Sequence, residues 1–420
     1  MKYLSLLILV FLFSFSFSSS FTNLKEVVKE NMKYIEVFEK SSFDTSILGF
    51  PGKMFLFNIF SQVWRGIPWR HDLLIITPLK YETDIVFIYL TGGSFRFDRG
   101  LLGQAVKLAN VTKIPVVVIY DIPNQPLFGY TEDNLMAYTF EKFMETEDST
   151  WILLYPMVKT VSTSLTFLNE YFKNNNISFI VGGVSKRGWT GWLSAVCDKR
   201  IKAIVPSSIN LLNLEKHMEL QIEEFGNYSQ ELEPYVKRGL TKEKVEEEKA
   251  RKLLKIIDPF YYIDDLKIPK YILVGSNDPY WPITAGKLYF PELLGEKFYI
   301  AMPNVGHTPN ERFIESYIMA YLGIKENFFP PKIITKYKKV NNKIIFEVKL
   351  EGYSSGEISL WYAENNSKDF RWISFKKLIL EKNIIEISPT KKYLAYFFDF
   401  VGNYKNFPIY SSTIPEIIEN

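Results

Sequence analysis

The chain has 420 residues, which is enough for more than one domain and for a large buried core. Its formal net charge is only +3, and we find neither a basic stripe of the kind that binds nucleic acid nor an acidic, disordered tail. Three scattered histidines and one cysteine form no metal-ligand spacing, so we expect no metal and no cofactor. Because Cys197 is the only cysteine, it cannot form an internal disulfide, and we expect an inert packing residue.

The first twenty residues have the pattern of a secretory signal peptide. Lys2 gives a short basic region, Leu4 to Phe15 an apolar segment, and the serines up to Ser20 the small residues that a signal peptidase needs. An uncleaved signal anchor is the alternative, but the apolar segment is short for a membrane span. We therefore expect a mature chain that is secreted, or lies in the lumen of the secretory pathway, and has no transmembrane segment.

Four Asn-x-Ser/Thr sequons are compatible with that pathway. Such sequons also arise by chance, so they add little to the localisation. The candidate glycosylation sites are Asn110, Asn176, Asn227 and Asn365.

Downstream, the sequence alternates between strands and helices. An amphipathic helix is expected over residues 23–39. Short β-branched runs then predict buried strands at residues 72–78, 84–90, 114–120, 178–183, 201–208, 270–278 and 296–304. Helical periodicity favours helices at residues 132–146, 157–172 and 311–323, and directly after Ser185. The alternation predicts an α/β domain over residues 21–329, with a mostly parallel sheet and helices on both faces.

Two segments depart from this rhythm. Residues 209–268 are polar and helical, with a dense charge run, and lie between two core strands as a lid-like insertion would. From Pro330 onward the sequence changes to short alternating strands separated by Asn, Gly and Ser turns. This pattern predicts a small all-β sandwich over residues 330–420, which could bind a partner or carbohydrate or simply buttress the core.

Three residues that follow predicted strands are the types that acyl transfer needs: Ser185, Asp278 and His307. In an open parallel sheet, the carboxyl ends of the strands meet at one edge, where ligands bind. A serine hydroxyl becomes a nucleophile when an imidazole takes its proton, and a carboxylate orients the imidazole. The chain order serine, acid, histidine is the order of α/β-hydrolases. The sequence therefore predicts a catalytic triad.

An oxyanion hole is predicted beside the triad. The backbone N–H of Lys186, which opens the helix after the serine, is one expected donor. The segment Tyr-Leu-Thr-Gly-Gly follows an early strand, and Gly92 or Gly93 can supply the second N–H. The turn itself departs from the G-x-S-x-G pattern, because Gly183 is present but the fifth position is Arg187. A side chain of that size must swing away from the turn.

Each part also has a structural interpretation. Ser185 could merely cap the helix that begins at Lys186, and Asp278 lies in a good turn sequence, Ser-Asn-Asp-Pro. His71 lies beside Pro-Trp-Arg, where a structural hydrogen bond is expected, and His217 lies in the polar insertion. The rival acids precede the strand at residues 270–278 and are Asp258, Asp264 and Asp265. Five tryptophans could line a cleft or pack in the core: Trp64, Trp69, Trp189, Trp192 and Trp281.

Longer stretches of the chain resemble one family, the PhoPQ-activated pathogenicity-related proteins, which include the amoebal autocrine proliferation repressor. In order, they are "SQVWRGIPWRHDLLIITP", "YLTGG", "TEDNLMAYTFEKF", "YPMVKT", "GGVSKRGWTGWLSAVCDKRIKAIVP", "DPFYYIDDLKIPKYILVGSNDPYW", "MPNVGHTPN" and "WYAENNSKDFRW". In this family Lys-Arg-Gly follows the serine, so the resemblance implies an arginine at the position of Arg187. It also implies an α/β-hydrolase-like domain with Ser185, Asp278 and His307 as its functional set.

Two main functions remain open at this point. The first is a secreted serine hydrolase that cleaves an ester or peptide bond in a small acyl or peptide substrate. The second is a secreted signalling or binding protein, similar to the proliferation repressor, that acts through a cell-surface receptor and has an idle triad. A purely structural secreted glycoprotein is the third interpretation. A fold alone does not decide between them.

Overall fold

The computed structural model describes residues 24–25, 33–241 and 248–420. The expected signal peptide, residues 1–20, lies outside the described residues. The helix expected over residues 23–39 is wrong at its end, because Glu36–Asp44 forms a strand, β1, that pairs antiparallel with β2, Gly52–Trp64. Pairing with β2 supplies the backbone hydrogen bonds of this segment and outweighs its helical pattern.

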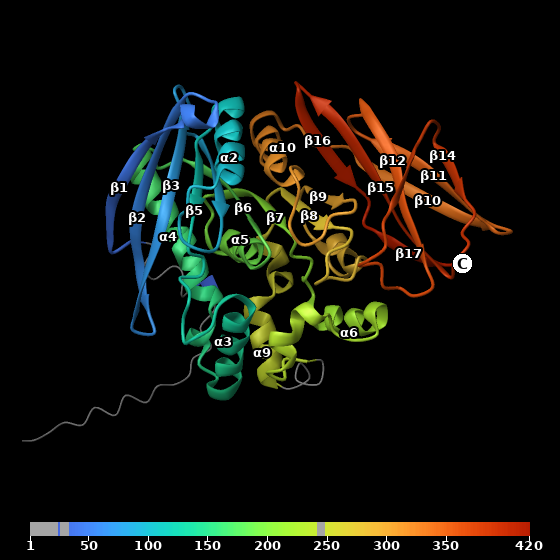
Figure 1. The fold of residues 1–420 in the computed structure, drawn as a ribbon, viewed down its shortest axis with the longest axis horizontal. Helices are drawn as coiled ribbons and strands as arrows, with labels where there is room; N and C mark the ends of the chain where they lie inside the picture. Colours follow the sequence, from blue (N-terminus) through green and yellow to red (C-terminus); the bar gives the residue numbers. More distant parts are fainter. Residues whose placement is uncertain (1–23, 26–32, 242–247) are drawn as a thin grey trace, which may run out of the picture.

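A mixed sheet forms the centre of the molecule (Figure 1). Its next strands are β3 (Ile67–Pro78), β4 (Ile85–Leu90), β5 (Val116–Ile119), β6 (Ser178–Val184), β7 (Ile201–Ser207), β8 (Lys270–Gly275) and β9 (Lys297–Met302). They lie in the order β1-β2-β3-β5-β4-β6-β7-β8-β9. The part from β5 to β9 is parallel, whereas β1, β2 and β3 add an antiparallel flank. The carboxyl ends of the parallel strands therefore share one edge.

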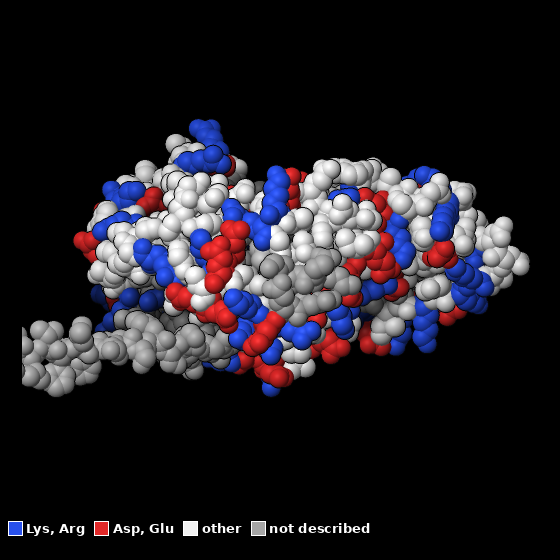
Figure 2. Space-filling model, turned by 90° about the horizontal axis from the view of Figure 1, so that it is seen from below, with Lys and Arg blue, Asp and Glu red and all other residues white. Residues whose placement is uncertain are grey.

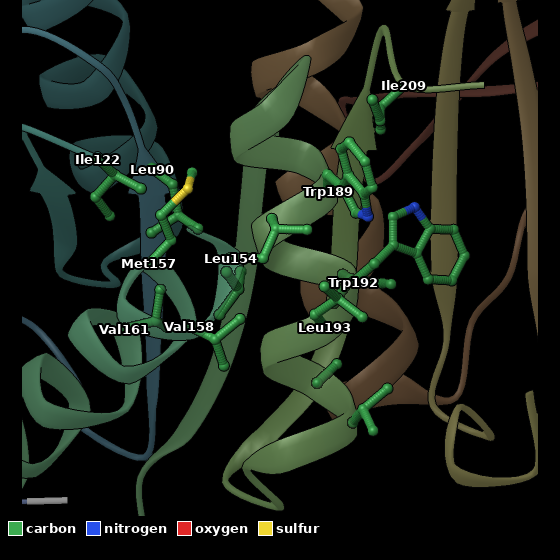
Figure 3. Close-up of a cluster of buried hydrophobic side chains, with 14 of the residues drawn as sticks. Leu90, Ile122, Leu154, Met157, Val158, Val161, Trp189, Trp192, Leu193 and Ile209 are labelled. Carbon is green, nitrogen blue, oxygen red and sulfur yellow. The ribbon is translucent and has the colours of Figure 1, made fainter. Parts of the chain in front are cut away.

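Helices cover both faces of this sheet. On one face lie α2 (Arg99–Thr112) and α10 (Arg312–Glu326), and on the other α4 (Leu154–Phe172) and α5 (Lys186–Cys197). Each face has its own apolar core. Figure 3 shows side chains of α4 and α5, including Val158 and Leu193, in the core of the second face. The predicted α/β-hydrolase-like architecture is confirmed.

The predicted insertion is helical among its described residues. It contains α6 (Leu214–Phe225), α7 (Glu233–Val236) and α9 (Glu248–Ile257). Together with α3 (Glu132–Thr146), these helices gather at the lower end of the molecule in Figure 1. The chain also contains short 3-10 helical segments at Thr45–Leu48, Ser149–Trp151, Gln230–Leu232, Pro259–Asp265, Ala285–Leu288 and Phe290–Glu292.

The C-terminal strands are β10 (Lys332–Val340), β11 (Lys343–Glu351), β12 (Gly356–Asn365), β13 (Lys376–Ile379), β14 (Ile384–Ile387), β15 (Tyr393–Tyr404), β16 (Phe407–Ser412) and β17 (Glu416–Glu419). Strands β10, β11 and β14 form a separate sheet that packs through an apolar cluster on β12, β15 and β17. The sandwich is joined to the central sheet. Its strand β16 pairs with β9, so the order β9-β16-β15-β12-β13 continues the central sheet.

Charge is distributed evenly on the face that carries the helical insertion. Figure 2 shows basic and acidic side chains interspersed there, without a field of one sign. Within residues 24–25, 33–241 and 248–420, we find no helix with the length and apolar character of a membrane span.

Candidate active site

The turn between β6 and α5 holds Ser185 in a strained backbone conformation. Its φ of 57° and ψ of −129° lie in a region that residues other than glycine rarely occupy. The backbone N–H of Ser185 donates to the Ser207 carbonyl at the end of β7 (2.8 Å), which fixes the turn. Its side chain makes no cap hydrogen bond to α5. The interpretation of Ser185 as a simple helix cap is therefore wrong.

Glycines let β6 and α5 approach closely enough for this turn. A Cβ on Gly183 would lie 2.8 Å from the backbone carbonyl carbon of Arg187. A Cβ on Gly188 would lie 2.8 Å from the carbonyl oxygen of Gly183. The close contact between strand and helix thus needs glycine at Gly188, one position later than in the G-x-S-x-G pattern.

The Arg187 side chain turns away from the serine, as its size requires. Its guanidinium donates two hydrogen bonds of 2.7 Å to the Glu132 carboxylate, and its Nε donates to the Ile122 carbonyl (2.6 Å). Burial opposes the ionisation of Glu132, but the hydrogen bonds and charges of Arg187 and Lys186 outweigh it and hold the pKa of Glu132 well below its usual range. A Cβ on Gly92 would lie 1.8 Å from the guanidinium. The guanidinium of Arg187 therefore leaves no room for a side chain at residue 92, which explains the glycine there.

His307 and Asp278 form a hydrogen-bonded pair. Nδ1 of His307 lies 3.0 and 2.9 Å from the two carboxylate oxygens of Asp278, a residue that is only 2% exposed. Asp278 also accepts the backbone N–H of Tyr280 (2.9 Å), so it is a turn former and an imidazole partner at once. The rival Asp258 instead accepts the backbone N–H of Leu214 at the start of α6 (2.7 Å).

Tyr280 closes one side of the site. Its ring stacks on the His307 imidazole, with 4.1 Å between the ring centroids and 29° between the planes. Its hydroxyl donates to Asp133 Oδ2 (3.2 Å), and Asp133 also accepts hydrogen bonds from the Tyr235 hydroxyl (3.0 Å) and Lys186 Nζ (3.2 Å). Asp133 therefore connects α3, the insertion, the turn after β8 and the helix that begins after the serine.

Ser185 lies between two cavities. The first has a volume of ≈380 Å³ and is lined by Ser185, Gly92, Lys186, Tyr280 and His307, among others. The second, of ≈130 Å³, extends from Ser185 beneath the helical insertion and has a mostly apolar wall. No hydrogen bond joins Ser185 to His307 in the described part of the chain, but both side chains border the first cavity.

Two of the residues predicted to form the oxyanion hole, Lys186 and Gly92, line the first cavity together with Ser185. Lys186 is the first residue of α5, so its N–H has no acceptor within the helix. Gly92 follows β4 and lines the first cavity, whereas Gly93, with a φ of 73°, lines the adjoining cavity beside Arg96. Of the two glycines considered from the sequence, Gly92 is the one that lines the same cavity as Ser185.

The other two histidines are buried. Nε2 of His71 lies 3.0 Å from Thr160 Oγ1 and Nδ1 lies 3.3 Å from the Tyr120 carbonyl, which confirms the structural hydrogen bonds expected there. Burial lowers the pKa of His71 to about 4 and that of His217 to about 3. His217 packs edge-on against Trp281 (5.2 Å between centroids). Nowhere in the described ranges do three or more His, Cys, Asp or Glu side chains cluster in a way that could hold a metal ion.

The five tryptophans do not share one cleft. Trp189 and Trp281 line the apolar cavity. Trp64 and Trp69 pack edge-on against each other (5.7 Å), and Trp192, which projects from α5 beside Trp189 in Figure 3, is fully buried. Packing accounts for these three, as it does for Cys197, which is buried and whose pKa burial raises to about 12.

The four sequons differ in their surroundings. Asn176 and Asn227 are exposed. Asn110 is buried in α2, where its Nδ2 donates to the Val106 carbonyl (3.0 Å), and Nδ2 of Asn365 donates to the Asp369 carbonyl (2.7 Å). The two exposed side chains are therefore the accessible ones in the folded chain.

A C-terminal loop contacts both loops of the histidine–acid pair, which sequence analysis missed. Nδ2 of Asn277, next to Asp278, donates to the carbonyls of Phe370, Arg371 and Ile373 at 3.1, 3.2 and 2.9 Å. Asn304, three residues before His307, donates to the Phe375 carbonyl (3.0 Å) and accepts its N–H (2.7 Å). Residues 370–375, here called the buttress loop, therefore hold both segments.

The sheet, its covering helices and the loops at the strand ends define the class: the chain has an α/β-hydrolase fold. Acetyl xylan esterase 1 from Thermoanaerobacterium sp. JW/SL YS485 matches with a TM-score of 0.54 at 18% identity, over 72% of this chain and 92% of that chain. An acetyl xylan esterase from Paenibacillus sp. R4 matches with a TM-score of 0.51 at 15% identity, over the same shares. At this level of identity the likeness concerns the fold alone.

The sequence comparisons are more specific than the likeness in fold. The model of the PhoPQ-activated pathogenicity-related proteins matches residues 41–371, and the chain belongs to this family. Autocrine proliferation repressor protein A of Dictyostelium discoideum is 30% identical over 274 residues. That match covers 60% of this chain and 55% of the relative, so the chain spans about half the length of the curated relative.

Proposed function

We propose that the chain is a secreted serine hydrolase that transfers an acyl group from an ester or peptide bond to water. The observation that carries this proposal is the arrangement of the site. The strained Ser185 borders the same cavity as His307, whose Nδ1 is hydrogen-bonded to the buried Asp278. Secretion rests on the signal-peptide pattern of residues 1–20. The α/β-hydrolase fold supports this reaction class.

In the first half of the reaction, Ser185 Oγ attacks the carbonyl carbon of the substrate while His307 Nε2 takes its proton. Asp278 accepts the Nδ1–H and so keeps Nε2 available as the base. The N–H groups of Lys186 and Gly92 stabilise the negative charge on the carbonyl oxygen. When the carbonyl re-forms, the bond to the leaving group breaks, and that group takes the proton from Nε2.

In the second half, His307 deprotonates a water molecule, which attacks the acyl-enzyme. The bond to Ser185 breaks, the carboxylic acid leaves, and Oγ regains a proton. This sequence requires Ser185 Oγ and His307 Nε2 to come within hydrogen-bonding reach when substrate is bound, since catalytic hydrogen bonds are often long in the free enzyme.

A fluorophosphonate probe tests the proposal directly, because it reacts with activated serines. The chain expressed from Phe21 is expected to be labelled, and the Ser185→Ala variant is not. Ser194→Ala is the matched control, since Ser194 lies in the same helix, is buried and has a side-chain hydroxyl without a hydrogen-bond partner among the described residues. Equal labelling of Ser185→Ala and the parent chain, or none in a folded sample, contradicts the proposal.

A secreted signalling protein is the second candidate. Its support is the 30% identity to a relative named as an autocrine proliferation repressor. Such a protein would bind a cell-surface receptor through its surface, so Ser185→Ala would repress growth as well as the parent chain does. Loss of growth repression in that variant would instead show that the signalling activity depends on the hydrolase site. Adding both proteins to proliferating cells at equal concentration measures the difference.

A further inference from the structure

The apolar cavity beneath the insertion begins at Ser185. Its wall includes Phe140 of α3, Trp189 of α5, and Ala250 and Leu253 of α9. The two sides of the cavity, α5 of the core and α9 of the insertion, are joined by a hydrogen bond: Nε1 of Trp189 donates to the carbonyl of Ile257 at the end of α9 (2.6 Å). The cavity therefore lies between the core and the insertion, and the candidate nucleophile Ser185 is among the residues that line it.

The stereochemistry of acyl transfer indicates which part of a substrate enters this cavity. The carbon under attack carries four groups in the tetrahedral intermediate: Ser185 Oγ, the oxyanion, the leaving group and the acyl chain. The oxyanion lies toward the N–H groups of Lys186 and Gly92. The leaving group must lie beside His307, which protonates it. The groups beside the oxyanion and beside the leaving group all line the first cavity. The acyl chain is the remaining part of the substrate, and we place it in the apolar cavity.

The size and polarity of the cavity limit that chain. A dry cavity of about 150 Å³ holds one benzene molecule. At ≈130 Å³, this cavity accommodates an apolar group of similar size. Its buried histidine, His217, is neutral, because burial lowers the pKa to about 3.

We propose that the cavity beneath the insertion binds the acyl group of an ester substrate, and that this group is apolar and about six carbons long. The inference rests on the proposed hydrolase function and adds the substrate class to it. An acyl chain much longer than six carbons exceeds the cavity, and acetate leaves most of it empty.

A series of 4-nitrophenyl esters tests the length, because all members share one leaving group. From acetate to butanoate and hexanoate, kcat/KM is expected to rise about fourfold for each methylene added. Octanoate and dodecanoate are expected to be slower than hexanoate. A profile that is flat, or that is highest for acetate, overturns the inference while leaving the hydrolase proposal intact. A chain that neither hydrolyses any ester nor reacts with fluorophosphonate overturns both.

Two variants of α9 test whether this cavity sets the length. Ala250→Trp fills the space and is expected to move the fastest ester to acetate or butanoate. Leu253→Ala enlarges it and is expected to move the optimum to octanoate, so the test does not depend on either variant alone. Labelling by a small ethyl fluorophosphonate is measured alongside and shows whether Ser185 is still reactive in each variant. Unchanged length profiles in both variants place the acyl group elsewhere.

Discussion

Asp278 differs from the other acids near the site in that both of its carboxylate oxygens lie within 3.0 Å of the His307 Nδ1. Asn at this position keeps the shape but cannot hold the imidazole in the tautomer that leaves Nε2 free to accept a proton. We expect Asp278→Asn to lower kcat/KM by about 10⁴-fold, with the circular dichroism spectrum unchanged. Steady-state ester hydrolysis measures the loss.

The rival acid provides the control. Asp258 accepts backbone N–H groups at the start of α6, and burial raises its pKa to about 7. Because it does not touch His307, Asp258→Asn should leave kcat/KM within about threefold of the parent value. Equal losses in the two variants would show that the acids act on the fold and not on His307.

At the scale of single elements, helix α5 provides two glycines with opposite surroundings. A Cβ on Gly188 meets the Gly183 carbonyl at 2.8 Å, whereas the nearest atom to a Cβ on Gly191 is a Val181 methyl at 3.8 Å. We expect Gly188→Ala to lower the free energy of unfolding by about 2 kcal/mol, because helix and strand must separate. Gly191→Ala should leave it unchanged or raise it by up to about 1 kcal/mol, since alanine favours the helix. Urea denaturation compares the two, and equal effects would mean that α5 does not pack on β6 as described.

Helix α6 carries a titrating group that makes its contact with the core depend on pH. Burial raises the pKa of Glu224 from 4.5 to about 7, while a hydrogen bond from Thr284 and the charge of Lys368 lower it slightly. The folded state therefore binds more protons than the unfolded state between about pH 4.5 and 7, so Glu224 lowers stability as pH rises through that window.

Glu224→Gln removes this dependence. At pH 5 the variant and the parent chain should differ little. At pH 8 the variant is expected to be more stable by about 3 kcal/mol, because the parent must keep a buried carboxylate ionised or protonate it at a cost. Urea midpoints at the two pH values measure the difference. A constant difference at both values contradicts the role assigned to Glu224.

At the scale of the whole molecule, the buttress loop joins the sandwich to the site. Three backbone carbonyls of that loop hold the Asn277 side chain, next to Asp278. Without them the acid loop shifts, and a misplacement of about 1 Å can cost about 10²-fold in rate. We expect Asn277→Ala to lower kcat by about that factor with KM nearly constant.

Asn383→Ala is the control for Asn277→Ala. Asn383 is exposed in the sandwich, so the same change of residue type there should leave kcat and KM unaltered. If Asn277→Ala lowers thermal stability but leaves kcat unchanged, the loop stabilises the fold and does not position Asp278.

The sequence could predict the features that are set by a few neighbouring residues, and it could not predict the contacts between distant segments. Local patterns were sufficient for α3 and β6, because their apolar spacing is set within a few residues, and for the turn at Ser185, because glycine and serine stand in the strand-to-helix step. The contact of Asn277 with Ile373, across 96 positions, has no local pattern, since any loop carbonyl can accept such a bond. Strand β1 was missed for the same reason: its partner β2 supplies the hydrogen bonds that decide its state.

The pairing of β16 with β9 has a consequence for how the chain is made. Strand β9 is the last strand of the parallel part, and its outer edge is covered by β16, where Ser412 lies opposite Tyr299. Ser412 is synthesised more than a hundred residues after Tyr299, so during translation this edge stays open until nearly the whole chain has emerged. An uncovered edge strand is a template for pairing with other chains. Premature termination just before β16 should therefore yield chains that aggregate, even though every residue of the candidate site has been made.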